Sequence, residues 1–138
     1  RWVRADFHLH TKQDKEFKDI GSDQDFLVGY IAALKKAEVR VGVITNHNKF
    51  DRGEFKTLRK AAKKEDIYLM PGIELSVKDG RNGIHTLVIF EEQWIDNHEN
   101  EDFINGFLKV TFAGQTNYEN KKGAALLERG QKAEIIAS

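Results

Sequence analysis

The alternation of strand-like and helix-like segments constrains the fold of this chain more than any other feature of its sequence. Apolar residues recur at helical spacing over residues 25–38 and 51–66. Runs rich in apolar and β-branched residues surround them, at residues 3–10, 39–45 and 67–70. This strand–helix–strand–helix–strand order predicts parallel strands joined by right-handed crossovers, and so an α/β fold with a mostly parallel sheet and flanking helices.

The two predicted helices have recognisable ends and faces. Ser22 or Asp23 is a suitable N-cap for the first helix. The second helix has an apolar face made by Phe55, Leu58, Ala61 and Ala62. Its opposite face is basic and consists of Lys56, Arg59, Lys60, Lys63 and Lys64. We expect this charged face to be a solvated surface rather than a binding patch.

The pattern changes after the third strand. Asn82-Gly83 is a hairpin signal ahead of a fourth strand at residues 85–90, which would then run antiparallel to the third. A further helix is predicted around Ala124 to Arg129. Large apolar residues between these points are expected to pack helices against the sheet, namely Trp94, Ile95, Phe103, Ile104, Phe107 and Leu108.

A His-x-His pair lies at the end of the first predicted strand. Side chains at alternate positions of a strand point to the same face, so His8 and His10 converge. Two neighbouring imidazoles repel if both are charged and cost free energy if buried without partners. A divalent metal removes both problems because it binds the neutral nitrogens. The alternative is a pair of histidines that faces a core or a cleft.

Other potential metal ligands also lie at the ends of predicted strands. His47 ends the second strand, Glu74 ends the third, and His85 begins the fourth. In parallel α/β sheets and barrels, functional groups gather at the carboxyl ends of the strands. His85 would reach the same edge if its strand runs antiparallel. The sequence therefore predicts a metal site built from histidines and one glutamate.

Composition narrows the chemistry of such a site. The chain has 138 residues, enough for one domain or part of one. Lysine plus arginine and aspartate plus glutamate both number 22, so no general positive field points to nucleic acid. With no cysteine, any metal must have nitrogen and oxygen ligands. No signal peptide, lipidation motif or membrane-spanning apolar run is evident, so no membrane partner and a cytoplasmic location are expected.

The order and spacing of these motifs resemble those of the PHP (polymerase and histidinol phosphatase) domain, over about residues 3 to 90. The first motif is Asp6-Phe7-His8-Leu9-His10-Thr11, and the second is Ile44-Thr45-Asn46-His47-Asn48. The third is Pro71-Gly72-Ile73-Glu74-Leu75. A later histidine heads an apolar strand in Gly83-Ile84-His85-Thr86-Leu87-Val88.

The resemblance implies a distorted seven-stranded β/α barrel, here partial, with two or three divalent metal ions. His8 and His10 would hold the first ion, and Glu74 would bridge two ions at the catalytic position. His85 would complete part of the second ion's ligands, and His47 would serve a third or neighbouring position. Glu16 lies where many members carry a further ligand, with Asp14 as its rival. Asp6 and Asn46 would orient the ligands without touching metal.

Three departures from the family pattern stand out. Asn46 replaces the usual aspartate of the second motif, which keeps hydrogen bonding but removes a charge. The late Asp-x-His motif is missing, because Asp96-Asn97-His98 comes too early and is expected to be exposed to solvent. Seven strands need more chain than 138 residues, so a fragment is expected rather than an incomplete barrel. Residues 1–112 would form the N-terminal part of the domain, and residues 113–138 a polar, partly helical continuation or insertion.

The expected chemistry is metal-dependent hydrolysis of a phosphate ester. Mixed histidine and carboxylate ligands suit Zn²⁺, Mn²⁺ or Fe²⁺ better than Mg²⁺. Metal-activated water would attack without a covalent enzyme intermediate. The segment after the fourth strand resembles PHP domains that precede an SMC- or AAA-like ATPase, which implies a nuclease acting on DNA or RNA and an ATPase domain or subunit as partner. A small-molecule phosphomonoesterase and a degenerate, non-catalytic scaffold are the alternatives, and this chain alone is expected to have little or no activity.

Overall fold

The computed structural model describes residues 2–18, 21–78, 83–96, 102–113 and 115–119, together with the backbone of residues 127–128. In chain order the elements are β1 (Arg4–Leu9), α1 (Asp23–Lys36), β2 (Val39–Ile44), α2 (Arg52–Lys64), β3 (Tyr68–Lys78), β4 (Ile84–Ile89), α3 (Gln93–Asp96), α4 (Phe103–Thr111) and β5 (Leu127–Glu128).

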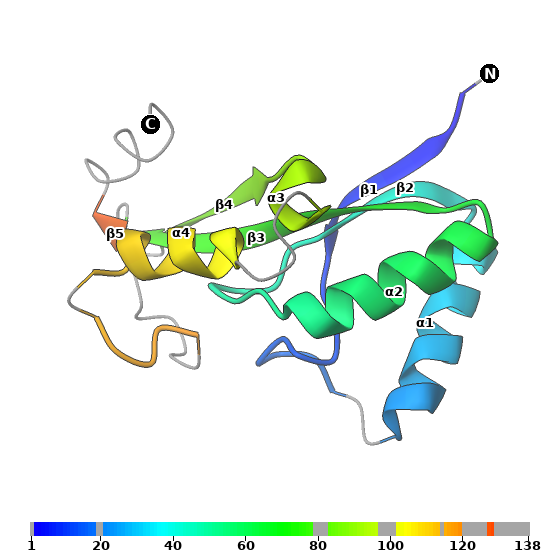
Figure 1. Ribbon diagram of the computed structural model, residues 1–138, viewed down its shortest axis with the longest axis horizontal. Helices are drawn as coiled ribbons and strands as arrows, with labels where there is room; N and C mark the ends of the chain where they lie inside the picture. The colour runs from blue at the N-terminus through cyan, green and yellow to red at the C-terminus, as the bar shows by residue number, and fades with distance from the viewer. Residues whose placement is uncertain are drawn as a thin grey trace.

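One curled sheet forms the centre of the fold, as a half-barrel with flanking helices (Figure 1). The strand order is β1-β2-β3-β4, and β5 pairs with β3. β1, β2 and β3 are parallel, whereas β4 is antiparallel to β3. The predicted α/β class, the parallel order of the first three strands and the reversed fourth strand are all confirmed.

β3 is the longest strand in the described part of the chain because it pairs with two partners in succession. Its first part pairs with β2 up to Pro71, opposite Ile44, and its second part pairs with β4 from Gly72, opposite Ile89. Proline has no N–H to donate, so the end of a ladder is a tolerable place for it within a strand. A Cβ atom on Gly72 would lie 2.7 Å from the Val43 side chain and 2.8 Å from the Val88 carbonyl oxygen. Only glycine therefore allows this close approach of the strands.

We expect Gly72→Ala to lower the free energy of unfolding by about 1–3 kcal/mol, the usual cost of overpacking a filled interior. The added methyl group meets backbone on one side and a buried side chain on the other, so neither can yield cheaply. Gly29→Ala is the matched control, because Gly29 lies in α1 with open space around its missing Cβ. That substitution should stabilise the protein by roughly 0.5–1 kcal/mol. Urea unfolding measures both, and equal effects of the two substitutions would contradict this view of Gly72.

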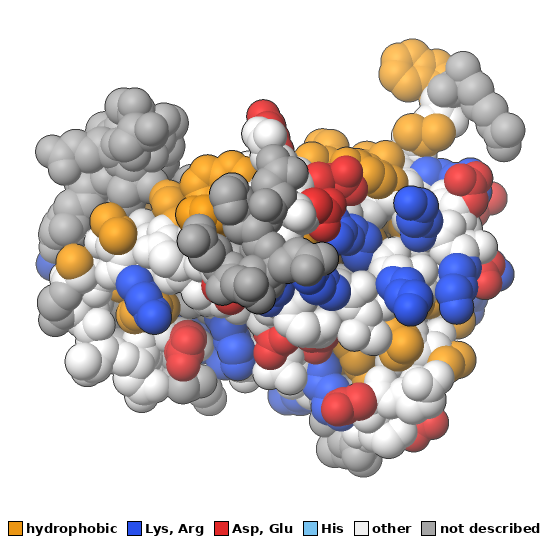
Figure 2. Space-filling view, viewed as in Figure 1, with side chains coloured by type: hydrophobic (Ala, Val, Ile, Leu, Met, Phe, Trp, Pro, Cys, Tyr) orange, Lys and Arg blue, Asp and Glu red, His pale blue; other side chains and the backbone are white. Residues whose placement is uncertain are grey.

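The two long helices begin and pack as their sequences suggest. Ser22 is the N-cap of α1, where a capping box joins it to Asp25. Asp51 caps α2 by accepting a hydrogen bond from the backbone N–H of Glu54. α2 buries Phe55, Leu58 and Ala62 against the sheet, and its lysine-rich face is turned to solvent (Figure 2). Among the described residues, no helix combines the length and apolarity that crossing a bilayer requires.

The later elements complete the core. Ile95, Ile104 and Leu108 are buried on α3 and α4, as predicted. The predicted helix at residues 124–129 is wrong at Leu127 and Glu128, which form β5. The reason lies in long-range pairing, because these two residues pair with Val77 and Lys78 at the end of β3.

Two predicted features fall partly outside the described residues. The hairpin turn covers residues 79–82, which are not described, and Gly83 next to it has φ of +68°, a conformation that suits glycine. Asp96 is about half exposed and forms an ion pair of 2.5 Å with Arg59, as expected for a solvated residue. Asn97 and His98 also lie outside the described residues.

Candidate metal centre

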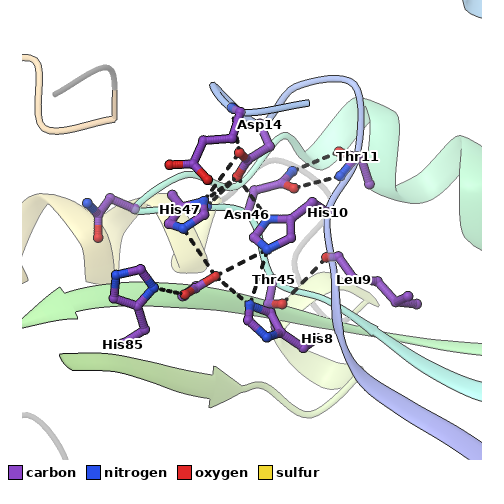
Figure 3. A network of polar contacts seen from close by, with 12 residues as sticks. His8, Leu9, His10, Thr11, Asp14, Thr45, Asn46, His47 and His85 are labelled. Carbon is purple, nitrogen blue, oxygen red and sulfur yellow. Dashed lines mark hydrogen bonds and ion pairs between the residues drawn. The ribbon is translucent and has the colours of Figure 1, made fainter. Parts of the chain in front are cut away.

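Strands β1 to β4 and the loops after β1 and β2 bring four histidines and two carboxylates together. The expectation that Glu74 ends the third strand is wrong, because β3 continues to Lys78 in order to pair with β4. His8 comes from β1, His47 follows β2, Glu74 lies within β3 and His85 lies within β4. The parallel ladder of β2 and β3 continues past Ile44 as a bridge between His47 and Glu74, which sets these two side by side. The four imidazole rings point toward one another in Figure 3.

Glu74 is the centre of this cluster. Its side chain is fully buried, and its carboxylate faces four imidazoles. Oε2 lies 2.6 Å from His8 Nε2, 3.3 Å from His10 Nε2 and 3.4 Å from His47 Nε2. Oε1 contacts His85 Nδ1. A buried carboxylate needs such compensation, because burial without partners disfavours its charged form.

Asp14 is a second buried carboxylate on the other side of two of these rings. Its Oδ2 lies 3.1 Å from His10 Nδ1 and 3.0 Å from His47 Nδ1. The same oxygen accepts the backbone N–H of His47 at 2.6 Å, and Oδ1 accepts the backbone N–H of Glu16 at 2.8 Å. Figure 3 shows Asp14 beside His10 and His47. These two rings thus lie between two carboxylates, Asp14 at their Nδ1 edges and Glu74 at their Nε2 edges.

Whether a cation fits in this cluster can be judged from the number of protons that the histidine rings carry. A neutral imidazole carries one N–H, so a ring that donates Nδ1–H to Asp14 has only a lone pair at Nε2. For His10 and His47 that lone pair faces an oxygen of Glu74, and His10 Nε2 also lies 3.1 Å from His8 Nε2. Acceptors that face acceptors in a buried place need positive charge between them. Extra protons supply it in acid, and a divalent cation supplies it when the rings are neutral. The donor set therefore fits a divalent metal.

Among the residues that the structure describes, three overlapping groups have ligand atoms within 4.8 Å of one another, and each could hold an ion. They are His8, His10 and Glu74; His47, Glu74 and His85; and His10, Asp14 and His47. Nitrogen and carboxylate ligands of this mixture suit Zn²⁺, Mn²⁺ or Fe²⁺. A divalent ion held by such residues supplies a Lewis acid for a carbonyl or phosphoryl oxygen and acidifies water at neutral pH.

The electrostatics of the cluster favour charged carboxylates. Burial alone would raise the pKa of Asp14, but its hydrogen bonds with His10 and His47 lower it well below the ordinary value. Burial also opposes ionisation of Glu74, but its contacts with His8 and His47 give it a lowered pKa. The hydrogen bond to Asp14 raises the pKa of His47, against the effect of burial. Without a metal, the site therefore favours a proton on His47 beside its two charged acids.

The structure brings together five of the predicted metal ligands, His8, His10, His47, Glu74 and His85. It does not bring Glu16 to them, because the Glu16 side chain is exposed and its backbone N–H bonds to Asp14. Of the two rival residues in this loop, Asp14 is the one beside the histidines.

The predicted orienting residues act on the backbone rather than on histidine rings. Asp6 accepts the backbone N–H of His8 at 3.0 Å. Asn46 is buried, accepts the backbone N–H of Thr11 and donates to its hydroxyl, both at 2.8 Å. The amide at position 46 therefore fixes the loop that follows His10, a role that an acid could fill only in part because it has no N–H.

Some supporting residues were not anticipated from the sequence. Asn48 has φ of +49°, which asparagine tolerates well, and its side-chain oxygen accepts the backbone N–H of Ser76 at 3.0 Å. Tyr30 donates its hydroxyl proton to the backbone oxygen of His10 at 2.9 Å. Thr11 hydrogen-bonds to the carboxylate of Glu54. Polar residues just after a strand were the available signal, but their partners lie far away in sequence.

Comparisons with known proteins concern the fold. No family model and no curated protein sequence matches this chain. A proposed metal-dependent phosphoesterase from Bifidobacterium adolescentis is similar, with 14% identity and a TM-score of 0.52 over 96% of this chain and 49% of that chain. An amidohydrolase from Chromobacterium violaceum, solved with bound sulfate and no metal, has 21% identity and a TM-score of 0.49 over 80% of this chain and 34% of that chain. This chain spans half or less of the length of either protein. The first likeness supports the barrel-type α/β fold.

Proposed function

We propose that the protein containing this chain is a metal-dependent phosphoesterase that hydrolyses phosphodiester bonds in DNA or RNA. The observation that carries the proposal is the buried Glu74 carboxylate with four imidazoles around it. A charged group enclosed by nitrogen lone pairs is expensive to maintain without a cation. Glu74 would hold two ions, one with His8 and His10 and the other with His47 and His85.

The exposure of the ligands favours a large substrate. The side chains of His8 and His85 are 50% and 54% exposed, whereas those of His47 and Glu74 are 6% and 0% exposed. Glu74 therefore lies on the buried side of the cluster, and the side between the rings of His8 and His85 is open to solvent. A phosphate group could approach there while the rest of a polynucleotide stays in solvent.

The residues of this chain have separate tasks in the proposed reaction. Glu74 keeps its negative charge and anchors both halves of the site, since its lowered pKa holds it ionised at neutral pH. His8 and His85 present ring edges toward solvent, where the substrate arrives. No described residue at this edge is an evident general acid, so we expect the leaving group to take its proton from water or from a part of the protein outside this chain.

Two finer parts of the proposal go beyond this chain. The resemblance of the segment after the fourth strand to ATPase-linked domains supports an ATPase module or subunit that controls cleavage. A histidinol-phosphatase-like phosphomonoesterase is the competing enzyme, and a scaffold without chemistry is the competing non-enzyme. Asn46 in place of an aspartate is the feature that favours a scaffold, whereas five clustered ligands oppose it.

The test combines metal analysis with three substrates, supplied with Mn²⁺: p-nitrophenyl phosphate, a dinucleotide phosphodiester and single-stranded DNA. We expect the full-length protein to bind metal and to cleave the two diesters, and we expect His8→Ala to abolish cleavage because that ring would be a direct ligand. Adding ATP to the protein with its neighbouring modules tests control by an ATPase. Cleavage of the monoester alone would establish the phosphatase instead. Bound metal with no turnover of any substrate by the full-length protein would favour the scaffold.

A further inference from the structure

We propose that Glu54 is a positioning residue for the metal centre, and that it acts through the hydroxyl group of Thr11. Glu54 lies in the first turn of α2, whereas Thr11 directly follows His10 in the loop after β1. The pair therefore joins α2 to the segment that carries a candidate metal ligand. This inference rests on the proposed metal-binding function, and it adds a residue that touches neither metal nor substrate.

Thr11 is buried and is held at each of its polar groups. Its backbone N–H donates to Asn46 Oδ1, and its hydroxyl oxygen accepts from Asn46 Nδ2, both at 2.8 Å (Figure 3). Its carbonyl oxygen accepts the backbone N–H of Asp14 at 2.9 Å. Its hydroxyl proton is donated to Glu54 Oε1. Thr11 thus sets the path of the chain from His10 to Asp14.

The backbone of Thr11 fixes the direction of these hydrogen bonds. A backbone N–H can only donate, so the amide oxygen of Asn46 must face it. The amide nitrogen of Asn46 then faces the hydroxyl oxygen, which must accept. A hydroxyl group has one proton, and here that proton is left for Glu54. The carboxylate therefore completes a chain of donors that runs from amide to hydroxyl to acid.

Glu54 also holds the loop at a second point. The backbone N–H of Gln13 donates to its carboxylate. The main chain of Glu54 is fixed separately, because its backbone N–H donates to the N-cap residue Asp51 at 2.8 Å. Removing the Glu54 carboxylate therefore takes an acceptor from two donors of the loop, whereas removing the Asp51 side chain takes one from the end of the helix.

The first test asks whether Asn46 and Glu54 share the Thr11 hydroxyl. An aspartate at position 46 would need the same proton that Glu54 accepts, so Asn46→Asp should lower the folding equilibrium constant about 5- to 100-fold, the usual effect of a buried polar group without its partner. Adding Glu54→Gln to that variant should recover most of the loss, because glutamine can donate an N–H to Thr11 while the hydroxyl donates to position 46. Urea unfolding of the metal-free protein at pH 7 measures both changes.

Additive effects of these two substitutions would overturn the proposal. Repulsion between two acids also couples them, and Thr11→Val separates the two causes because it removes the hydroxyl and keeps the shape of the side chain. In that background we expect most of the rescue by Glu54→Gln to disappear. A rescue of the same size would be due to charge repulsion and would overturn the proposal.

The second test asks whether this contact serves the metal. Glu54→Ala should lower the affinity for Zn²⁺ about 10-fold, an effect of the size seen when a residue that supports metal ligands is lost. Glu54→Gln should keep most of the affinity, because it retains an acceptor oxygen for the Thr11 hydroxyl. Asp51→Ala is the control, since its hydrogen bond is to the backbone of α2 and its loss should leave Zn²⁺ affinity unchanged.

Equal losses of Zn²⁺ affinity in Glu54→Ala and Asp51→Ala would show that Glu54 only stabilises the helix, and would overturn the proposal. Undiminished affinity in Glu54→Ala would overturn the positioning role and leave the proposed function of the protein intact. Failure of the unsubstituted protein to bind Zn²⁺ would refute that function and the positioning role with it.

Discussion

Replacement of Glu74 by glutamine should remove metal-dependent hydrolysis, with a loss on the order of 10³-fold or more, since bound metal contributes several kcal/mol to transition-state stabilisation. The reason is the position of this carboxylate, which contacts all four imidazoles and belongs to two of the three possible ion sites. Glutamine keeps the shape of the side chain but brings no charge to balance a divalent ion. We therefore expect saturated Glu74→Gln to retain fewer ions than the unsubstituted protein in metal analysis.

The control for this substitution is Glu65→Gln. Glu65 pairs with Lys35 on the surface and lies outside the cluster, so the same chemical change should leave hydrolysis and metal content as they were. Circular dichroism of both variants checks that the fold persists. Full metal content and full activity in Glu74→Gln would contradict a centre built around this residue.

Metal should stabilise the protein strongly in mild alkali and much less in acid. The raised pKa of His47 means that its contribution to the stability of the metal-free protein is complete below about pH 6.5 and is lost as pH rises through the folded-state pKa. The lowered pKa values of Asp14 and Glu74 affect stability in acid. Their contributions to the stability of the metal-free protein are present above about pH 4 and are lost as acid protonates the two carboxylates. The metal-free protein should therefore be most stable between about pH 4 and 6.5.

Divalent ions change this profile because they bind only unprotonated histidines. At pH 8, Zn²⁺ at about 100 times its Kd should add about 2.7 kcal/mol to the free energy of unfolding. At pH 5 the same Zn²⁺ concentration should add much less, because the ion must compete with the proton that the raised pKa of His47 retains. Urea unfolding with metal and with chelator, at both pH values, measures the difference. Equal stabilisation at the two pH values would count against binding through histidine.

The parts of the site that local sequence rules determine could be predicted. His8 and His10 share a face because strands repeat every two residues, and His47 and Glu74 meet because the parallel pairing of β2 and β3 continues past Ile44 as a bridge between them. The reversed direction of the strand carrying His85 followed from its hairpin signal.

Other parts depended on contacts between distant residues. The choice between Asp14 and Glu16 rests on the path of the loop after β1, which the Asn46 amide fixes from 35 residues away. Asn46 itself was expected to orient a ligand, but it holds the backbone of Thr11. The two-residue strand β5 forms by pairing with β3, and no local sequence pattern at Leu127 predicts that pairing.

Anomalous X-ray diffraction from crystals of the Zn²⁺-loaded protein is the most direct measurement of whether this cluster is a metal centre. We predict anomalous peaks beside the Glu74 carboxylate, toward the Nε2 atoms of His8 and His10 and toward His47 and His85. Crystals soaked at saturating Zn²⁺ that showed no peak among these residues would contradict a metal centre at this edge of the sheet.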